Sequence, residues 1–277
     1  RVAITRDCRL SSPRIHEALR DGIALTGLSL VDLGMGPTPL SYFGVFHLEL
    51  DGGVMVTGSH NPADENGFKV MAGKATITSD DIAELRAIVE KGDFDLRPGG
   101  RVTSRDLTAA YAGFVRGNIR RHRTDVRFAI DAGNGAGGPL AMAALRACGL
   151  SPVALLVEPD GHFPVHHPDP SLPENVALLA RTVLVQGLEL GVAYDGDADR
   201  IGVVDATGRI LYGDELLVLL ARDVLARRPG AAVLGEVKCS QKLYDDIAAR
   251  GGRPILWKTG HSLIKKKMRE EGALLAG

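Results

Sequence analysis

The chain has 277 residues, of which 45% are hydrophobic and 24% are charged, which is ordinary for a globular protein. Its 33 Lys and Arg residues nearly balance its 34 Asp and Glu residues, which argues against broad nucleic-acid binding. No apolar run reaches the roughly 18 residues that a membrane span requires. Cys8, Cys148 and Cys239 are odd in number and far apart, so a reducing cytoplasm is expected rather than a disulfide framework.

Strands and helices are predicted to alternate along the first third of the chain. Apolar runs indicate strands at residues 1–5, 28–34 and 52–58, and helical patterns cover residues 11–27, 38–48 and 79–92. Pro13 is typical of a helix start, and Ser79 precedes two acidic residues that favour a first helical turn. A break at residues 97–100 then ends this first unit.

The alternation restarts twice after that break. Helices are predicted at residues 103–122, 138–149 and 173–187, with strands at 125–131, 151–158, 188–195 and 201–206. A third round from Asp214 predicts helices at 214–228, 240–252 and 262–272, with strands at 231–237, 253–257 and 273–276. We therefore expect three consecutive α/β domains of similar plan with mixed, mainly parallel sheets, at residues 1–105, 106–208 and 209–277.

The segment "DGDADR" places Asp195, Asp197 and Asp199 directly after a predicted strand. Carboxylates this close repel one another unless a cation neutralises them, and hard divalent cations prefer oxygen ligands. A calcium EF-hand does not fit, because its sixth and twelfth loop positions would be Arg200 and Ala206 instead of Gly and Glu. The pattern therefore favours a divalent metal site over an acidic surface turn.

A second glycine-rich segment, "DAGNGAGG", leaves two interpretations open. Gly133, Gly135 and Gly138 match G-x-G-x-x-G between a predicted strand and a predicted helix, and Glu158 lies 20 residues after Gly138. This is the spacing of a dinucleotide-binding turn, which would suit a nicotinamide-dependent oxidoreductase. The same glycines would equally suit a strand-to-helix turn that packs tightly.

Ser59 follows the buried run "VMV" on a polar tip. A nucleophile elbow would need Gly at both positions that hold Thr57 and Asn61, and His60 is too close in sequence to act as a base for Ser59. Lys69 lies ten residues further on. A hydroxyl, a lysine, an arginine and clustered aspartates together suit phosphoryl transfer assisted by a divalent ion.

Several of these segments together resemble one known family. "TGSHNP", "NGFK", "HHPDP", "PEN", "DGDADR" and "KTGHSLIKKKM" occur in the order and spacing of the α-D-phosphohexomutase family, and most resemble its bacterial phosphomannomutase/phosphoglucomutase branch. The resemblance implies an isomerase that moves a phosphoryl group between sugar 1-phosphate and sugar 6-phosphate through a phosphoserine and a bisphosphorylated sugar. It implies Mg²⁺ and a sugar 1,6-bisphosphate as cofactors, and mannose or glucose phosphates as substrates.

The resemblance also implies roles for single residues. Ser59 matches the phosphorylated serine, and it completes a magnesium site formed by the three aspartates of "DGDADR". The resemblance implies catalytic residues around the transferred group at His60, Lys69 and Arg200. It implies supporting residues at Arg6, Asp7 and Asn61. It implies substrate-binding residues at Lys238, Thr259, Gly260 and His261. The glycines of "DAGNGAGG" match a loop that binds no dinucleotide.

The sequence departs from the family pattern in three respects. Ala198 replaces a glycine of the metal loop, and we expect metal binding to survive unless that position needs positive φ. An arginine-containing segment expected before Arg1 is absent, and so is the fourth domain of the family. We therefore expect a fragment of a longer polypeptide, and the alternative is a truncated, non-catalytic chain that binds magnesium and sugar phosphate. Further expectations are a cytoplasmic monomer or weak oligomer, without nucleic-acid or membrane partners.

Overall fold

The computed structural model describes residues 1–119, 123 and 125–277. These residues form two compact units, one of residues 1–77 and 82–210 and the other of residues 78–81 and 211–277. The first unit contains two β-sheets, and the second contains one. No helix among the described residues combines the length and the apolar composition needed to cross a bilayer.

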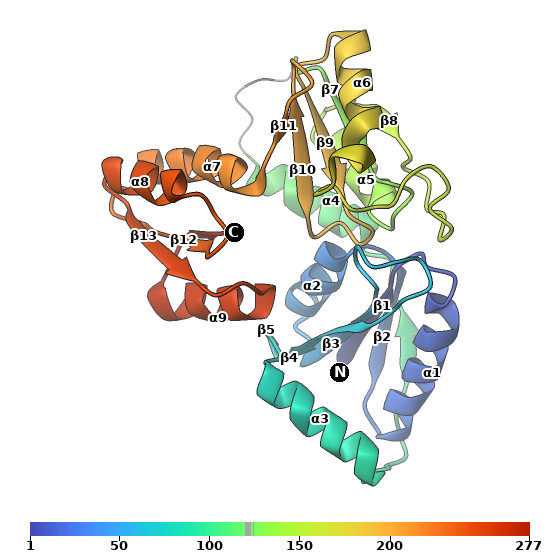
Figure 1. Ribbon diagram of the computed structural model, residues 1–277. Helices are drawn as coiled ribbons and strands as arrows, with labels where there is room; N and C mark the ends of the chain where they lie inside the picture. The colour runs from blue at the N-terminus through green and yellow to red at the C-terminus, as the bar shows by residue number, and fades with distance from the viewer. Residues whose placement is uncertain (120–122, 124) are drawn as a thin grey trace. The chain divides into compact units, whose positions relative to one another are not determined.

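The first sheet has the strand order β5-β4-β3-β1-β2-β6. Its strands are β1 (Val2–Arg6), β2 (Leu30–Met35), β3 (Gly52–Val56), β4 (Phe68–Ala72), β5 (Ala75–Thr76) and β6 (Val102–Ser104). β1 pairs in parallel with β2 and β3, β2 pairs in parallel with β6, and the hairpin partners β4 and β5 are antiparallel. Helices α1 (Ser12–Leu25) and α2 (Thr38–His47) cover opposite faces of this sheet (Figure 1).

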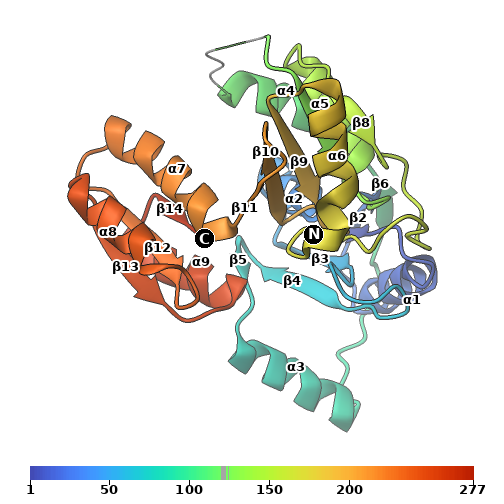
Figure 2. The same cartoon turned by 45° about the horizontal axis from the view of Figure 1, so that its top comes forward.

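Two parts of this sheet differ from the sequence-based prediction. β4 and β5 were not predicted as strands, and Figure 2 shows β4 leading into the short β5 beyond β3. The helix predicted over residues 103–122 gives way to β6 at its start, and α4 covers only Thr108–Asn118. Predicted residues 120–122 lie outside the described residues. α3 (Ser79–Lys91) follows β5, and all of its residues are at least partly exposed.

The second sheet of this unit has the strand order β11-β10-β9-β7-β8. Its strands are β7 (Phe128–Asp131), β8 (Val153–Leu155), β9 (Leu190–Tyr194), β10 (Ile201–Asp205) and β11 (Ile210–Leu211). β7 pairs in parallel with β8 and β9, and β10 pairs antiparallel with β9. Its helices are α5 (Gly138–Ala147), the 3₁₀ turn η1 (Pro173–Val176) and α6 (Ala177–Gln186). Leu179 and Val183 of α6 pack into its core beside Ala129 and Ala193.

The second unit has a three-stranded parallel sheet of order β13-β12-β14. Its strands are β12 (Ala232–Glu236), β13 (Arg253–Trp257) and β14 (Leu275–Ala276). Helices α7 (Gly213–Arg227) and α8 (Gln241–Ala249) cover one face, and α9 (His261–Glu271) covers the other (Figure 1). The prediction of α/β domains with mixed, mainly parallel sheets is thus confirmed across three sheets.

The polar loops of the first unit follow the carboxyl ends of parallel strands. β1 and β3 end at Arg6 and Val56, just before Asp7 and Ser59. β7 and β9 end at Asp131 and Tyr194, just before the glycine-rich loop and the "DGDADR" loop. Ligands bind preferentially beyond such strand ends in α/β sheets, so the two sheets offer candidate groups at corresponding edges.

Candidate active site

Ser59 is held on a tight turn directly after β3. Its backbone has φ 50°, which is uncommon for a residue with a side chain and costs conformational energy. Its main-chain N–H donates to the Thr57 hydroxyl at 2.9 Å. Its own hydroxyl donates to Oδ2 of Asp195 at 2.7 Å, although 136 residues separate the two in sequence. The strained turn therefore presents the serine hydroxyl to the aspartate cluster.

The three aspartates of "DGDADR" converge as their spacing predicted. One carboxylate oxygen from each of Asp195, Asp197 and Asp199 lies within 4.8 Å of the others. Asp195 and Asp197 have no solvent exposure. Burial and the neighbouring carboxylates raise the pKa of Asp195 to about 7, because its charged form is poorly solvated and repelled. A group of this kind has a strong electrostatic demand for a cation.

Lys69 of β4 supplies one such cation. Its Nζ lies 2.6 Å from Oδ2 of Asp197 and 2.6 Å from Oδ2 of Asp199. Burial alone would lower the pKa of Lys69, but the two carboxylates outweigh burial and raise this pKa. Burial likewise disfavours the charged form of Asp197, yet the ammonium and three hydrogen bonds lower its pKa. Lys69 therefore contacts two of the aspartates with which it was predicted to act.

The donor set of this cluster fits a hard divalent cation. Oδ1 of Asp197 is buried and accepts no hydrogen bond from any residue that the structure describes. A buried carboxylate oxygen without a partner is costly, and coordination to a metal would satisfy it. The available ligands are carboxylate and hydroxyl oxygens, with no nitrogen or sulfur among them, which suits Mg²⁺ better than Zn²⁺.

Ala198, which replaces a glycine in the metal loop, has the positive φ that was the condition on its tolerance there. Its φ is 53°, in the left-handed region that glycine adopts without strain and other residues disfavour. Its Cβ fits only because the facing residue is Gly137, where an added Cβ would lie 2.4 Å from that of Ala198. The alanine in the metal loop is therefore strained and is accommodated by the opposite loop.

The glycine-rich loop supports the metal loop and is not arranged to bind a dinucleotide. A Cβ at Gly135 would lie 2.7 Å from the Gly196 carbonyl, and one at Gly138 would lie 2.0 Å from the Val157 carbonyl. The four N–H groups that would face a pyrophosphate already donate within the protein. The donors and their acceptors are Gly133 and Asp131 Oδ1, Asn134 and the Leu156 carbonyl, Gly135 and the Ala132 carbonyl, and Ala136 and the Gly196 carbonyl. The loop therefore does not form the anion-binding turn that a nicotinamide-dependent oxidoreductase would need.

His60 and Arg200 also lie beside the serine and the aspartates. Nδ1 of His60 is 3.4 Å from the Ser59 hydroxyl oxygen. Burial and the charge of Arg200 lower the pKa of His60, which favours its neutral form. The Arg200 N–H donates to Oδ1 of Asp195 at 2.9 Å, while its side chain is exposed.

The predicted supporting residues occupy the loops around the serine. Oδ2 of Asp7 accepts a hydrogen bond from the Gly58 N–H at 3.1 Å. Arg6 donates to the Asp7 carbonyl at 3.1 Å. The Asn61 amide donates to Glu65 Oε2 at 2.8 Å, within the serine loop. All three residues therefore contact the loop or its anchor.

Two threonines at this site were missed by sequence reasoning. The hydroxyls of Thr38 and Thr57 donate to Oδ2 of Asp197 at 2.8 and 3.0 Å, and the Thr38 N–H donates to the Asp197 carbonyl at 2.9 Å. Thr38 is the first residue of α2, where the helix dipole favours a neighbouring negative charge. The only sequence signal for Thr38 was its place shortly after a predicted strand, which does not indicate Asp197 as its partner.

The loop that contains "HHPDP", residues 166–170, links the two sheets of the first unit. Nε2 of His166 lies 3.1 Å from Oδ2 of Asp131, at the end of β7. Nε2 of His167 lies 2.5 Å from the main-chain carbonyl of His60, beside the serine. Pro168 packs against Gly133 and Gly196. This loop therefore links the serine turn to both glycine-containing loops.

The predicted substrate-binding residues all belong to the second unit. Lys238 follows β12, and its Nζ lies 3.0 Å from Glu236 Oε1, with 70% of its side chain exposed. Gly260 is the N-cap of α9 with φ 128°, and His261 begins that helix. A pocket of about 450 Å³ is lined by Val237, Leu256, Trp257, Lys258 and Thr259. Of the predicted residues, only Thr259 lines it.

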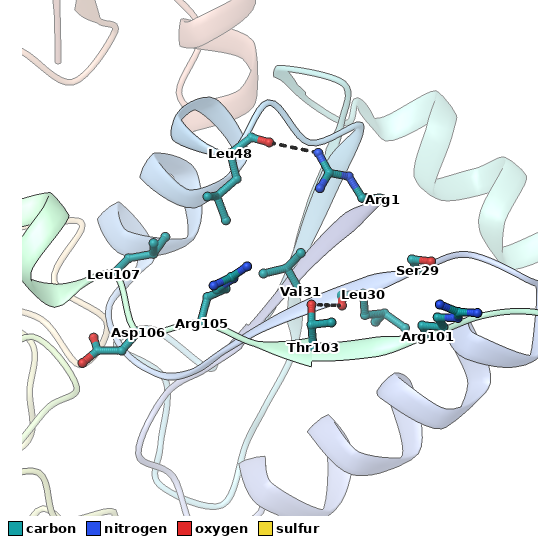
Figure 3. A pocket seen from close by; sticks show the side chains of 10 residues that line it. All are labelled: Arg1, Ser29, Leu30, Val31, Leu48, Arg101, Thr103, Arg105, Asp106 and Leu107. Carbon is teal, nitrogen blue, oxygen red and sulfur yellow. Dashed lines mark hydrogen bonds between the residues drawn. The ribbon is translucent and has the colours of Figure 1, made fainter.

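Another pocket, of about 500 Å³, lies beside the first sheet, and Figure 3 shows the residues that line it. Its lining includes Arg1 and Ser29, which precede β1 and β2, and Arg101, which precedes β6. Its lining residues include neither Ser59 nor any of the three aspartates, so this pocket is separate from the candidate active site.

Comparison with known proteins places the three sheets in one family. Models of phosphoglucomutase/phosphomannomutase alpha/beta/alpha domains I, II and III match residues 1–96, 109–208 and 212–277, respectively. The chain is 46% identical over its whole length to a phosphomannomutase/phosphoglucomutase of Pseudomonas aeruginosa, of which it covers 59%. It is 45% identical to a phosphoglucomutase of Neisseria gonorrhoeae, of which it covers 60%.

The solved structures agree with these sequence relatives. A phosphoglucomutase/phosphomannomutase family protein from Burkholderia thailandensis superposes with a TM-score of 0.95 at 42% identity, over 100% of this chain and 62% of that one. A putative phosphomannomutase from Thermus thermophilus gives 0.89 at 26% identity, over 100% of this chain and 64% of that one. The chain thus spans about three-fifths of the length of the relatives it matches.

Proposed function

Because the chain belongs to the phosphoglucomutase/phosphomannomutase family, the α-D-phosphohexomutases, we propose that its protein interconverts hexose 1-phosphate and hexose 6-phosphate. The relatives are named as glucose and mannose phosphate mutases, and one or both of these sugars would be the substrate. Ser59 would carry the phosphoryl group between the two positions of the sugar.

The observation that carries this proposal is the hydrogen bond of 2.7 Å from the Ser59 hydroxyl to Asp195. It places a potential phosphoryl carrier against three carboxylates that need a cation. Lys69 is held in the same cluster by two contacts of 2.6 Å. Phosphoryl transfer depends mainly on such positioning and charge neutralisation, which supports this chemistry over a hydrolase or an oxidoreductase.

In the forward half-reaction, a sugar hydroxyl attacks the phosphorus of phosphorylated Ser59. The bond from phosphorus to the sugar oxygen forms, the bond to Ser59 Oγ breaks, and the hydroxyl proton ends on Oγ. Lys69, whose raised pKa keeps it protonated, would donate its proton to Oγ and then take up the proton of the sugar hydroxyl, so that the net movement is from the hydroxyl to Oγ. The bisphosphorylated sugar then turns over, and Ser59 Oγ attacks the phosphorus of its other phosphoryl group. The bond from that phosphorus to the sugar oxygen breaks, the sugar oxygen takes up a proton, and Ser59 is phosphorylated again. His60 and Arg200 lie beside the transferring group.

Ser59, Asp195, Asp197 and Asp199 would hold Mg²⁺ at this site. A bound divalent ion would neutralise charge on the phosphoryl oxygens during transfer. The buried and unpaired Oδ1 of Asp197 supports this assignment. A sugar 1,6-bisphosphate would load the serine at the start of a reaction cycle and so act as an activator.

The second unit would recognise the sugar phosphate. Lys238 is largely exposed and carries a charge suited to phosphate. Thr259, Gly260 and His261 stand at the start of α9, where the helix dipole and the main-chain N–H groups of a first turn favour an anion. Cys8, Cys148 and Cys239 form no disulfide with one another, which supports a reducing, cytoplasmic setting. We propose a monomer or weak oligomer with small-molecule sugar phosphates as its partners.

The test is a coupled mutase assay on the natural polypeptide that contains these 277 residues, with glucose 1-phosphate and mannose 1-phosphate as substrates. Ser59→Ala should abolish turnover because the carrier oxygen is lost. Ser151→Ala, an exposed position before β8, is the matched control and should retain wild-type activity. Turnover by the Ser59→Ala protein at the wild-type rate would refute the proposal.

A further inference from the structure

The guanidinium of Arg9 lies beneath the loop that carries Ser59, and only 1% of this arginine is exposed. Its Nη2 donates to the main-chain carbonyls of Ser59 at 3.0 Å and Asn61 at 2.6 Å. Its Nη1 donates to the carbonyls of Pro62 and, at 3.0 Å, Glu65. A single planar group therefore satisfies four carbonyls of one loop and fixes its curvature.

The charge of Arg9 is balanced by Asp7, which also contacts the serine loop. Nε of Arg9 lies 3.2 Å from Oδ2 of Asp7, and both side chains are almost fully buried. The same carboxylate accepts hydrogen bonds from the N–H groups of Gly58 and Arg9 at 3.1 and 3.0 Å. Arg9 and Asp7 thus hold the loop by its carbonyl groups and by an N–H group, respectively.

Neighbouring residues restrict where the guanidinium of Arg9 can lie. A Cβ at Gly58 would lie 2.6 Å from both Cζ and Nε of Arg9, so the guanidinium fits only against a glycine. On another side, Cζ of Arg9 lies 5.4 Å from the centre of the Phe163 ring. A buried guanidinium confined in this way can impose a conformation on the loop that it contacts.

The conformation that needs support is that of Ser59. A residue with a side chain at φ 50° is strained, and such strain persists only where surrounding contacts enforce it. The Ser59 carbonyl is held by Arg9, and the Ser59 hydroxyl then points at Asp195. We propose that Arg9 is a positioning residue for phosphoryl transfer, which aligns Ser59 Oγ through the backbone without touching the sugar. This inference rests on the proposed role of Ser59.

Arg9→Lys in the natural polypeptide separates positioning from charge. Lysine keeps the positive charge beside Asp7, but its compact ammonium cannot span four carbonyls. Because small misplacements of reacting groups are costly, kcat should fall by about 100-fold while KM for the sugar phosphate stays near its wild-type value. The rate at which a sugar 1,6-bisphosphate phosphorylates Ser59 in a single turnover should fall in parallel. Arg14→Lys, at an exposed position of α1, is the matched control.

Gly58→Ala provides a second variant that retains Arg9 itself. The new methyl group would lie 2.6 Å from Cζ of Arg9 and 2.7 Å from the Glu65 carbonyl oxygen, so it should separate the guanidinium from the loop carbonyl that it holds. We expect the same loss of kcat with little change in KM, and this variant decides the matter if the Arg9→Lys protein unfolds. Wild-type kcat and phosphorylation rate in either folded variant would overturn the inference. Failure of the proposed function would look different. The unaltered polypeptide would then lack mutase activity, or the Ser59→Ala protein would keep it. Either result would contradict both the mutase function and the positioning role of Arg9.

Discussion

The main-chain carbonyl of Ser59 faces Gly196 so closely that a Cβ at position 196 would lie 2.4 Å from the carbonyl oxygen. The serine turn and the metal loop come from different sheets, and they meet at this contact without any intervening side chain. The position of Ser59 Oγ relative to the aspartates therefore depends on a glycine that bears no chemistry of its own.

Gly196→Ala should separate the serine turn from the metal loop. The added methyl group cannot fit unless one of the loops moves, so we expect kcat to fall by about 100-fold. Steady-state mutase assays would measure this loss. Gly113→Ala, where the new Cβ would have no described neighbour within 4 Å apart from the adjacent residues and backbone of its own helix, is the control and should leave kcat unchanged. Equal activity in the two variants would show that the contact is not needed.

Ala198→Gly should stabilise the protein. Glycine adopts φ 53° without the steric cost that alanine bears, and we expect a gain of about 1 kcal/mol in the free energy of unfolding. Urea denaturation would measure it. Ala143→Gly within α5 is the opposing control, because glycine in a helix interior should cost about 1 kcal/mol. A loss of stability in Ala198→Gly would contradict the strain inferred for the metal loop.

Removal of the Lys69 ammonium should make stability depend on metal. Lys69→Met leaves Asp197 buried without its cation, so we expect a loss of about 3 kcal/mol in a chelator. Mg²⁺ should restore part of this loss and raise the melting temperature of the variant more than that of the wild type. Thermal unfolding with and without Mg²⁺ tests this, with exposed Lys91→Met as control. An identical response of the variant and the wild type would exclude a metal at the aspartates.

The contact between His166 and Asp131 should give a pH-dependent contribution to stability. The hydrogen bond to Asp131 raises the pKa of His166 in the folded state. The contribution should thus be complete below the unfolded value of about 6.5 and lost as pH rises through the folded pKa. Urea unfolding of wild type and His166→Asn at pH 5.5 and pH 9 would show it. A stability difference that grows with increasing pH would have the wrong sign.

The fold followed from sequence wherever apolar periodicity was strong. The predicted strand at residues 52–58 corresponds to β3, and the helix at 79–92 corresponds to α3. β6 was missed because its three residues are all exposed and carry no alternating apolar pattern. β4 pairs antiparallel with β3 at the side of the sheet, and its polar flanks resembled a loop.

The candidate site was likewise predictable from sequence only in part. Ser59 and the aspartates stand in short motifs whose chemistry is readable from the residues themselves. Arg9 and Thr38 act through contacts with residues far away in the sequence, and nothing in their immediate neighbours indicates those partners. Their roles become visible only when the sheets bring strand ends together.

Direct detection of the phosphoryl group on Ser59 tests the central claim. The natural polypeptide would be incubated with Mg²⁺ and glucose 1,6-bisphosphate, digested, and analysed by mass spectrometry. We predict one phosphoryl group on the peptide containing Ser59, and its transfer to added glucose 6-phosphate or glucose 1-phosphate. Mutase turnover with the transferable phosphoryl group on a different residue, or with no phosphorylated protein at all, would contradict this account.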